Sequence, residues 1–125
     1  MPTTRVPAIK VLLLPKDTNA LGTIFGGVIL SHIDLASAVE ARKTARHRYV
    51  TKAMNAVEFH APVFVGDLVT FYAEIARVGK TSIMVEVEVF AQRNPDDIVT
   101  VRVTEASLTY VAVDATRRPR PMPPA

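Results

Sequence analysis

Asp34 is an ionisable side chain in a stretch that is otherwise almost wholly apolar. The other polar residues between positions 28 and 39 are Ser31, His32 and Ser37. A helix without a wide polar face is normally enclosed by protein, where a carboxylate costs several kcal/mol unless it is paired or hydrogen-bonded. Two interpretations stay open. Asp34 is either a structural carboxylate, bonded to a serine one turn away or to an arginine of a neighbouring strand, or a general base or nucleophile.

A glycine pair, Gly26-Gly27, stands at the expected start of this helix. Unpaired N–H groups at a helix N-terminus bind anions or developing oxyanions, and glycine lets a ligand approach the backbone closely. Such a pair can equally serve close packing. Asn19 ends a polar loop before the helix, and asparagine commonly caps helices and shapes turns there.

The three histidines, His32, His47 and His60, are scattered along the chain. Their spacing does not predict a metal site. His32 is offset from Asp34 around the helix, so it is expected to pack or to cap. His60 follows a predicted strand and is expected to be structural.

The composition predicts one globular domain spanning residues 1–125, because the chain has 125 residues and 49% of them are apolar. No apolar run approaches the length of a membrane span, and the first residues lack a secretion signal. Cysteine is absent, which excludes thiolate chemistry and fits a cytoplasmic location.

The net charge of +3 is concentrated in two basic clusters, Arg42–Arg48 and Arg117–Arg120. Cations at a helix C-terminus interact favourably with its dipole, and the second cluster can be a solvated tail. Alternatively, either cluster meets a phosphate-bearing ligand. Aromatic residues make up only 6% of the chain, which argues against nucleic-acid binding.

The elements that must position these residues follow from the hydrophobic pattern. A short strand over 8–14 and a helix over about 26–45 precede a strand over 50–59. Three alternating strands follow, from 69, 83 and 99, with a tight hairpin at 78–81 and a longer link at 93–97. This order predicts an α+β fold in which one helix lies across a five-stranded antiparallel sheet. One sheet cannot cover a helix that is apolar all round, so we expect a second copy of the chain.

The core is expected over about 8–113. From residue 114 the chain is rich in proline and arginine, with Pro119, Pro121, Pro123 and Pro124. We therefore expect residues 114–125 to form an extended, poorly ordered tail.

A set of motifs runs along the chain through residues 17–27, Ser31 and Asp34, then 59–62, 66–67, 79–82 and 104–106. In this order the set resembles the hotdog-fold acyl-CoA thioesterases of the YciA type. Each is common alone, but their order and spacing as a set are specific. The resemblance covers about residues 9–121.

The resemblance implies hydrolysis of acyl-coenzyme A to coenzyme A and a carboxylic acid, with no further cofactor. By position, Asp34 is the catalytic carboxylate, acting as general base or as nucleophile. Asn19 holds the water or thioester from the partner subunit, and the N–H of Gly27 polarises the carbonyl. The active sites are shared within a homodimer, and members of the family usually assemble as hexamers.

For coenzyme A the resemblance points to the hairpin Arg77, Gly79, Lys80, Thr81 and Ser82. The family tends to carry two adjacent basic residues before the hairpin glycine, but Val78 replaces the second here. We also assign substrate binding to Gly26, Ser31 and Thr51.

The prediction is therefore a cytoplasmic, homo-oligomeric acyl-CoA thioesterase. Two alternatives are a non-catalytic acyl-CoA binding or sensing module on the same scaffold, and a thioesterase acting on acyl-carrier-protein esters. A hydratase is disfavoured, because the sequence has no Asp-x-x-x-x-His pattern.

Overall fold

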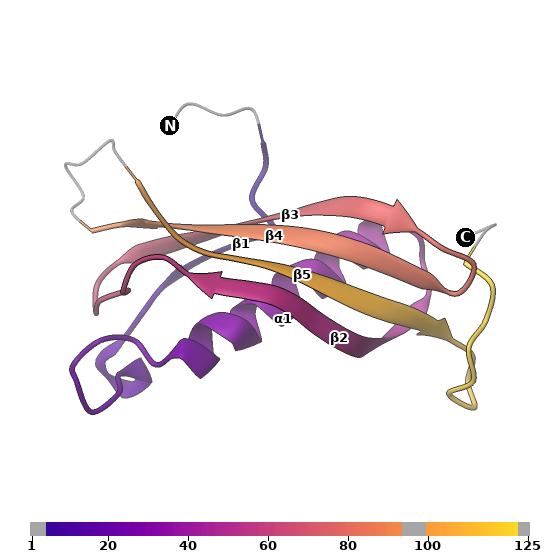
Figure 1. Cartoon of the computed structure of the whole chain (residues 1–125), viewed down its shortest axis with the longest axis horizontal. Helices are drawn as coiled ribbons and strands as arrows, with labels where there is room; N and C mark the ends of the chain where they lie inside the picture. Colours follow the sequence, from indigo (N-terminus) through magenta and orange to yellow (C-terminus); the bar gives the residue numbers. More distant parts are fainter. Residues whose placement is uncertain (1–4, 94–99, 123–125) are drawn as a thin grey trace.

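The computed structural model describes residues 5–93 and 100–122. These residues form one sheet and one long helix (Figure 1). The elements in chain order are β1 Ile9–Leu12, the 3-10 helix η1 Pro15–Asp17, α1 Gly26–Thr44, β2 Arg48–Phe59, β3 Leu68–Val78, β4 Ser82–Gln92 and β5 Val101–Val113. The sheet order is β1-β3-β4-β5-β2, and every neighbouring pair is antiparallel. The predicted α+β layering is confirmed.

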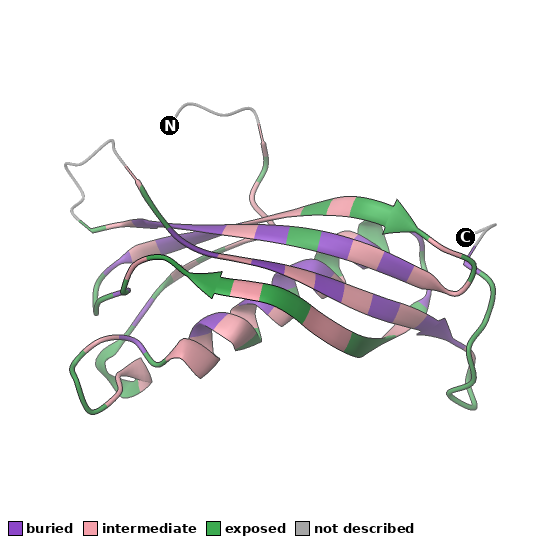
Figure 2. Cartoon of the chain, in the orientation of Figure 1, coloured by how far each residue is buried: buried purple, intermediate pink, exposed green. Residues whose placement is uncertain are grey.

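Helix α1 lies across one face of the sheet, as Figure 1 shows. Its inner side carries small and branched residues at helical spacing, including Ile29, Ile33 and Ala36, all buried. The strands pack alternating apolar residues against this side of the helix, and Phe71 and Leu108 among them are fully buried. Figure 2 shows this alternation along β4 and β5, so the core is the layer between the sheet and α1.

Strand β1 covers Ile9–Leu12 and is shorter than the predicted 8–14, whereas the later strands extend beyond the predicted pattern. Strand β5 continues to Val113 because Ala106, Leu108, Tyr110 and Ala112 extend the buried alternation beyond the expected end. The helix begins at Gly26 as predicted and ends at Thr44. Most of the expected link at 93–97, and the start of the last strand at residue 99, lie outside the described residues.

The outer side of α1 is not covered within one chain. Leu35 is 56% exposed and Val39 is 43% exposed. Strand β2 is an edge strand of the sheet, and its residue Val50 is also exposed. Within the described ranges, no helix combines the length and hydrophobicity needed to cross a membrane.

The expectation of a poorly ordered tail is wrong for residues 114–122. The Asp114 carboxylate accepts hydrogen bonds from the backbone N–H groups of Thr116 and Arg118, at 2.8 and 3.0 Å. The Thr116 hydroxyl also donates to this carboxylate and contributes most to holding the pKa of Asp114 below its usual value. The two N–H groups add to this effect. These hydrogen bonds close a turn that reverses the chain, and proline does not prevent such a reversal. Pro123 and Pro124 lie outside the described residues.

Beyond that turn the chain is anchored by Met122, which is 1% exposed. Its N–H donates to the carbonyl of Lys80 at 2.6 Å. The buried His47 donates from Nε2 to the carbonyl of Met122 at 2.7 Å. The buried side chain of Met122 and these two backbone contacts thus fix a segment whose overall composition indicated disorder.

Candidate active site

The carboxylate of Asp34 is half-buried on α1 and faces strands β2 and β5. The Thr51 hydroxyl on β2 donates to Oδ1 at 3.1 Å. The Tyr110 hydroxyl on β5 shares its hydrogen between Oδ1, at 2.6 Å, and the backbone carbonyl of Asp34, at 2.8 Å. Two neutral donors therefore hold one carboxylate oxygen in a fixed orientation.

Tyr110 and Thr51 are directly opposite each other on adjacent strands, so the sheet presents both hydroxyls to Asp34 together. The Tyr110 side chain is 2% exposed. Its burial, followed by its bond to the Asp34 carboxylate, raises the pKa of Tyr110 well above its ordinary range. The phenol consequently stays protonated and keeps donating at neutral pH.

Sequence reasoning missed Tyr110. A signal was present, because this tyrosine falls on the inward register of β5 between Leu108 and Ala112. A buried tyrosine needs a partner for its hydroxyl, and the partner here is Asp34.

The partners proposed for a structural Asp34 were wrong. They are a threonine and a tyrosine, not a serine or an arginine. Ser31, assigned to substrate binding, is exposed one turn before Asp34. Thr51, also assigned to substrate, has its hydroxyl engaged by the carboxylate.

Gly26 and Gly27 open α1 as predicted, and no side chain caps this end of the helix. Gly26 lines an apolar cleft of about 280 Å³ beside Phe59 and Ile29. A Cβ at Gly27 would lie 2.6 Å from the Phe25 ring, whereas one at Gly26 would meet Phe59 at 3.5 Å. The helix start thus combines bare N–H groups with an apolar cleft.

The Asn19 side chain organises its own loop. Its Oδ1 accepts from the N–H groups of Leu21 and Thr23, and its Nδ2 donates to the Thr23 hydroxyl at 2.9 Å. The expected turn-shaping role is therefore present in the structure.

One chain does not bring Asp34 and Gly27 together. Asp34 lies seven positions after Gly27 on α1, which corresponds to about 10 Å along the axis and nearly two full turns. They lie on similar sides of the helix, but one thioester group cannot reach both.

The hairpin predicted for coenzyme A is the turn between β3 and β4, at the opposite end of the sheet from the helix start (Figure 1). Gly79 donates its N–H to the carbonyl of Ser82 at 2.7 Å, so that group is used within the turn. The carbonyls of Lys80 and Thr81 accept bonds from Met122 and Ala112. Arg77 and Lys80 are exposed.

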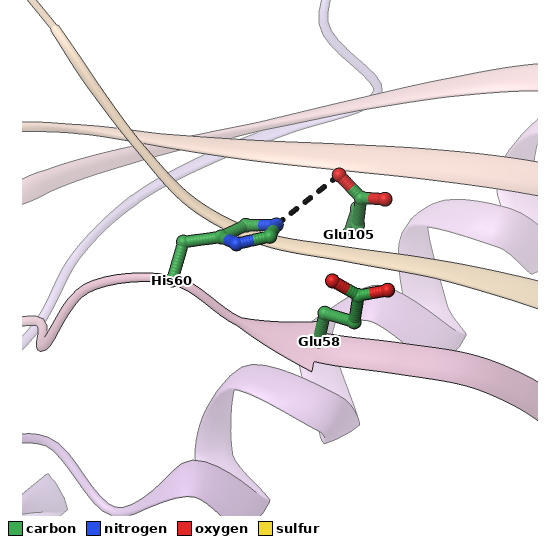
Figure 3. A group of neighbouring side chains, drawn as sticks. All are labelled: Glu58, His60 and Glu105. Atoms are coloured by element: carbon green, nitrogen blue, oxygen red, sulfur yellow. Dashed lines mark hydrogen bonds and ion pairs between the residues drawn. The ribbon is translucent and has the colours of Figure 1, made fainter.

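The sequence predicted no metal site, yet the fold brings Glu58, His60 and Glu105 together (Figure 3). Their candidate ligand atoms lie within 4.8 Å of one another, and His60 Nε2 is 3.2 Å from Glu105 Oε2. Arg102 also pairs with Glu105 and lies 3.4 Å from Glu88. Because an arginine already neutralises the central carboxylate, this donor set fits an ion-pair network better than a metal site.

His32 is a packed side chain, as predicted. Its Nδ1 lies 2.8 Å from the carbonyl of Val28, and its ring stacks on Phe71.

Comparison with known proteins independently supports the family that the sequence motifs predicted. The family described as the thioesterase superfamily matches residues 21–98. The acyl-CoA thioester hydrolase YciA of Salmonella typhimurium is 40% identical over 117 residues, which cover 92% of this chain and 88% of that protein.

Two solved structures are similar along almost the whole chain. A hexameric hotdog fold thioesterase of Campylobacter jejuni is 46% identical, with a TM-score of 0.87, covering 93% of this chain and 89% of that one. A hexameric broad specificity acyl-coenzyme A thioesterase, solved with an aspartate replaced by alanine, is 37% identical with a TM-score of 0.89. That match covers 97% of this chain and 88% of that one.

Proposed function

The chain belongs to the thioesterase superfamily, and we propose that it is an acyl-CoA thioesterase, which uses water to split acyl-CoA into coenzyme A and a carboxylic acid. The observation that carries the proposal is the Asp34 carboxylate, half-buried on the helix of a hotdog fold and oriented by Thr51 and Tyr110. Thr51 and Tyr110 are positioning residues, because they act through Asp34.

In the proposed reaction Asp34 accepts a proton from a water molecule as the water oxygen attacks the thioester carbonyl. Thr51 and Tyr110 engage mainly Oδ1, which leaves lone pairs of Oδ2 for the water. General-base catalysis of this kind contributes roughly 10²–10⁴-fold. The C–S bond then breaks, and the departing coenzyme A thiolate takes up the proton from Asp34, which restores the carboxylate. Direct attack by Asp34 through an acyl anhydride is the alternative route.

The tetrahedral oxyanion needs a donor, and the N–H of Gly27 at the uncapped helix start is the proposed one. A donor of this type contributes about 3–4 kcal/mol. Because Gly27 and Asp34 of one chain are about 10 Å apart along α1, each site must combine Asp34 of one subunit with the helix start of another. The Asn19 loop would accompany that helix start.

A homodimer is supported by the uncovered apolar side of α1 and by the edge position of β2. Long, exposed edge strands favour pairing with a second chain. We propose that dimers assemble further into a hexamer, as in the two similar solved structures.

Substrate contacts are proposed at Gly26, beside the apolar cleft, at the exposed Ser31, and at the hairpin. In the hairpin Arg77, Lys80 and the Ser82 hydroxyl remain available, whereas the Gly79 N–H is used internally. The Thr81 hydroxyl is a further candidate. We propose a single domain over residues 1–125 that needs no cofactor and acts in the cytoplasm, where acyl-CoA is made and consumed.

The test is turnover of a panel of acyl-CoA esters, followed by release of free thiol, for the native protein and for Asp34→Ala. The proposal expects thiol release by the native protein and almost none by the variant. A native protein that binds acyl-CoA without releasing thiol is a sensing module, and this result overturns the proposal. Faster turnover of the carrier-protein ester of the same acyl group would instead redirect the substrate assignment.

A further inference from the structure

The first basic cluster of the sequence and Arg120 of the second meet in one cleft of the folded chain. A cleft of about 660 Å³ lies at the C-terminal end of α1. Its walls include Arg42, Lys43, Arg46 and Arg48 from the helix end and the start of β2, and Arg120 from the folded-back tail. Residues separated by more than seventy positions are thus brought to one concave surface.

Most of these cations have no anionic partner within residues 5–93 and 100–122. Lys43 lies 3.6 Å from Glu40, but Arg42, Arg46 and Arg48 form no ion pair or side-chain hydrogen bond in the described ranges. Asp114 is the one carboxylate lining the cleft. It is engaged by the N–H groups and hydroxyl of its own turn, and it also interacts electrostatically with Arg120.

The helix dipole does not account for the whole set. Its field favours cations within the last turn, which covers Arg42 and Lys43. Arg48 belongs to β2, and Arg120 is fixed in the tail by the bond from its N–H to the carbonyl of Ala112 at 2.8 Å. Cations that line one cleft repel one another where they lie within a Debye length, about 8 Å, so a bound anion would stabilise the arrangement.

We propose that this cleft binds the phosphate groups of the coenzyme A nucleotide, an inference that rests on the proposed function. Arginine suits the task because its planar guanidinium grips phosphate oxygens in pairs. Arg42 follows Asp34 by eight residues on α1, about 12 Å along the axis. The thioester and the phosphates of acyl-CoA are likewise held apart, by the pantetheine arm, so one extended substrate reaches from the middle of the helix to its C-terminal end.

The ordered tail forms one wall of the cleft. His47 lines the cleft and donates to the carbonyl of Met122, while Met122 is buried. Arg120 lies two residues before this anchor, so its position is set by the fold.

The experiment compares two substrates with the same acyl group, acyl-CoA and acyl-pantetheine, which lacks the nucleotide phosphates. The double variant Arg46→Ala/Arg120→Ala is expected to raise KM for acyl-CoA at least tenfold while leaving kcat and the KM for acyl-pantetheine unchanged. The matched control Arg117→Ala/Arg118→Ala removes two tail cations that do not line the cleft and should leave both KM values unchanged. An unchanged KM for acyl-CoA in the cleft variant, or an equal rise for both substrates, overturns the proposal.

A second measurement separates the cleft from the reaction. Calorimetric binding of adenosine 3′,5′-bisphosphate, which carries nucleotide phosphates without a thioester, should weaken at least tenfold in the cleft variant. If the native protein releases no thiol but this binding is lost in the variant, the proposed function fails and the cleft assignment stands. If the bisphosphate binds in the cleft while the KM for acyl-CoA is unaffected, the cleft is an effector site for free nucleotide, and the substrate assignment is overturned.

Discussion

The middle of α1 and its C-terminal end treat charge in opposite ways. At the middle, the carboxylate of Asp34 accepts hydrogen bonds from two hydroxyls of the sheet. At its end, three arginines line a cleft without a described anionic partner. A satisfied, oriented group suits chemistry, because its geometry must not change between turnovers. Unpaired cations suit binding, because their energy is released only when a ligand arrives.

Replacing Asp34 by Asn should break the chemical end of this contrast most severely. The amide keeps the shape and can still accept from Tyr110, but it cannot take a proton from water. We expect kcat to fall by about 10²–10⁴-fold, with the fold retained. Steady-state kinetics with circular dichroism as a control on folding would measure this, and a near-native kcat would remove Asp34 from the reaction.

Met122→Ala tests whether the binding end depends on the anchored tail. Truncating a buried methionine should lower the free energy of unfolding by about 2–5 kcal/mol if the tail stays docked, and by less if it detaches. If the tail detaches, KM for acyl-CoA should also rise, because Arg120 loses its position. Urea unfolding and kinetics provide the two measurements, with the exposed neighbour Pro121→Ala as the matched control. A variant with native stability and native KM would show that the tail is a spectator.

Tyr110→Phe should sharpen the account of the chemical end. The ring remains, but Asp34 loses one donor, so the free energy of unfolding should fall by about 0.5–1.5 kcal/mol. We also expect a lower kcat at unchanged KM, since the hydroxyl orients the base without touching substrate. Tyr72→Phe, on the outer face of the sheet, is the matched control. Equal effects of the two substitutions would argue against orientation by Tyr110.

The smallest expected effect is a dependence of stability on alkaline pH. Burial and the bond to Asp34 raise the pKa of Tyr110 above its ordinary value of 10.0. The folded chain then holds a proton that the unfolded chain releases, so stability is complete below about pH 10 and falls as the pH rises further. Unfolding curves between pH 8 and 11 should show a shallower loss for Tyr110→Phe than for the native protein. Identical slopes would contradict a buried, protonated phenol.

The sequence predicted the layers of the fold well, because apolar alternation in the strands and the glycine pair before the helix are local signals. It also located Asp34, since a carboxylate among apolar residues stands out. It did not predict the partners of Asp34. Thr51 and Tyr110 meet the helix only through the pairing of β2 with β5, a contact between residues far apart in the chain.

The basic cleft was hidden for the same reason. Arg46 and Arg120 belong to two clusters that are far apart in the sequence. The prolines of the tail predicted a poorly ordered segment. One buried residue, Met122, reverses that expectation, and its burial depends on the end of the hairpin at Lys80. The local composition of the tail does not predict that Met122 packs against the distant hairpin.

Strand β2 departs from regular pairing twice, between Thr51 and Ala53 and between Asn55 and Glu58. In each place it uses one residue more than β5 over the same span, and Ala56 adopts a left-handed conformation with φ of 51°. Bulges of this kind bend the strand and increase its local twist. A chain shortened by one residue at each bulge would keep its alternation of faces but flatten, drawing the Thr51 hydroxyl away from Asp34. Residues of β2 that do not contact the Asp34 carboxylate therefore help to fix its orientation, because they set the curvature that places Thr51.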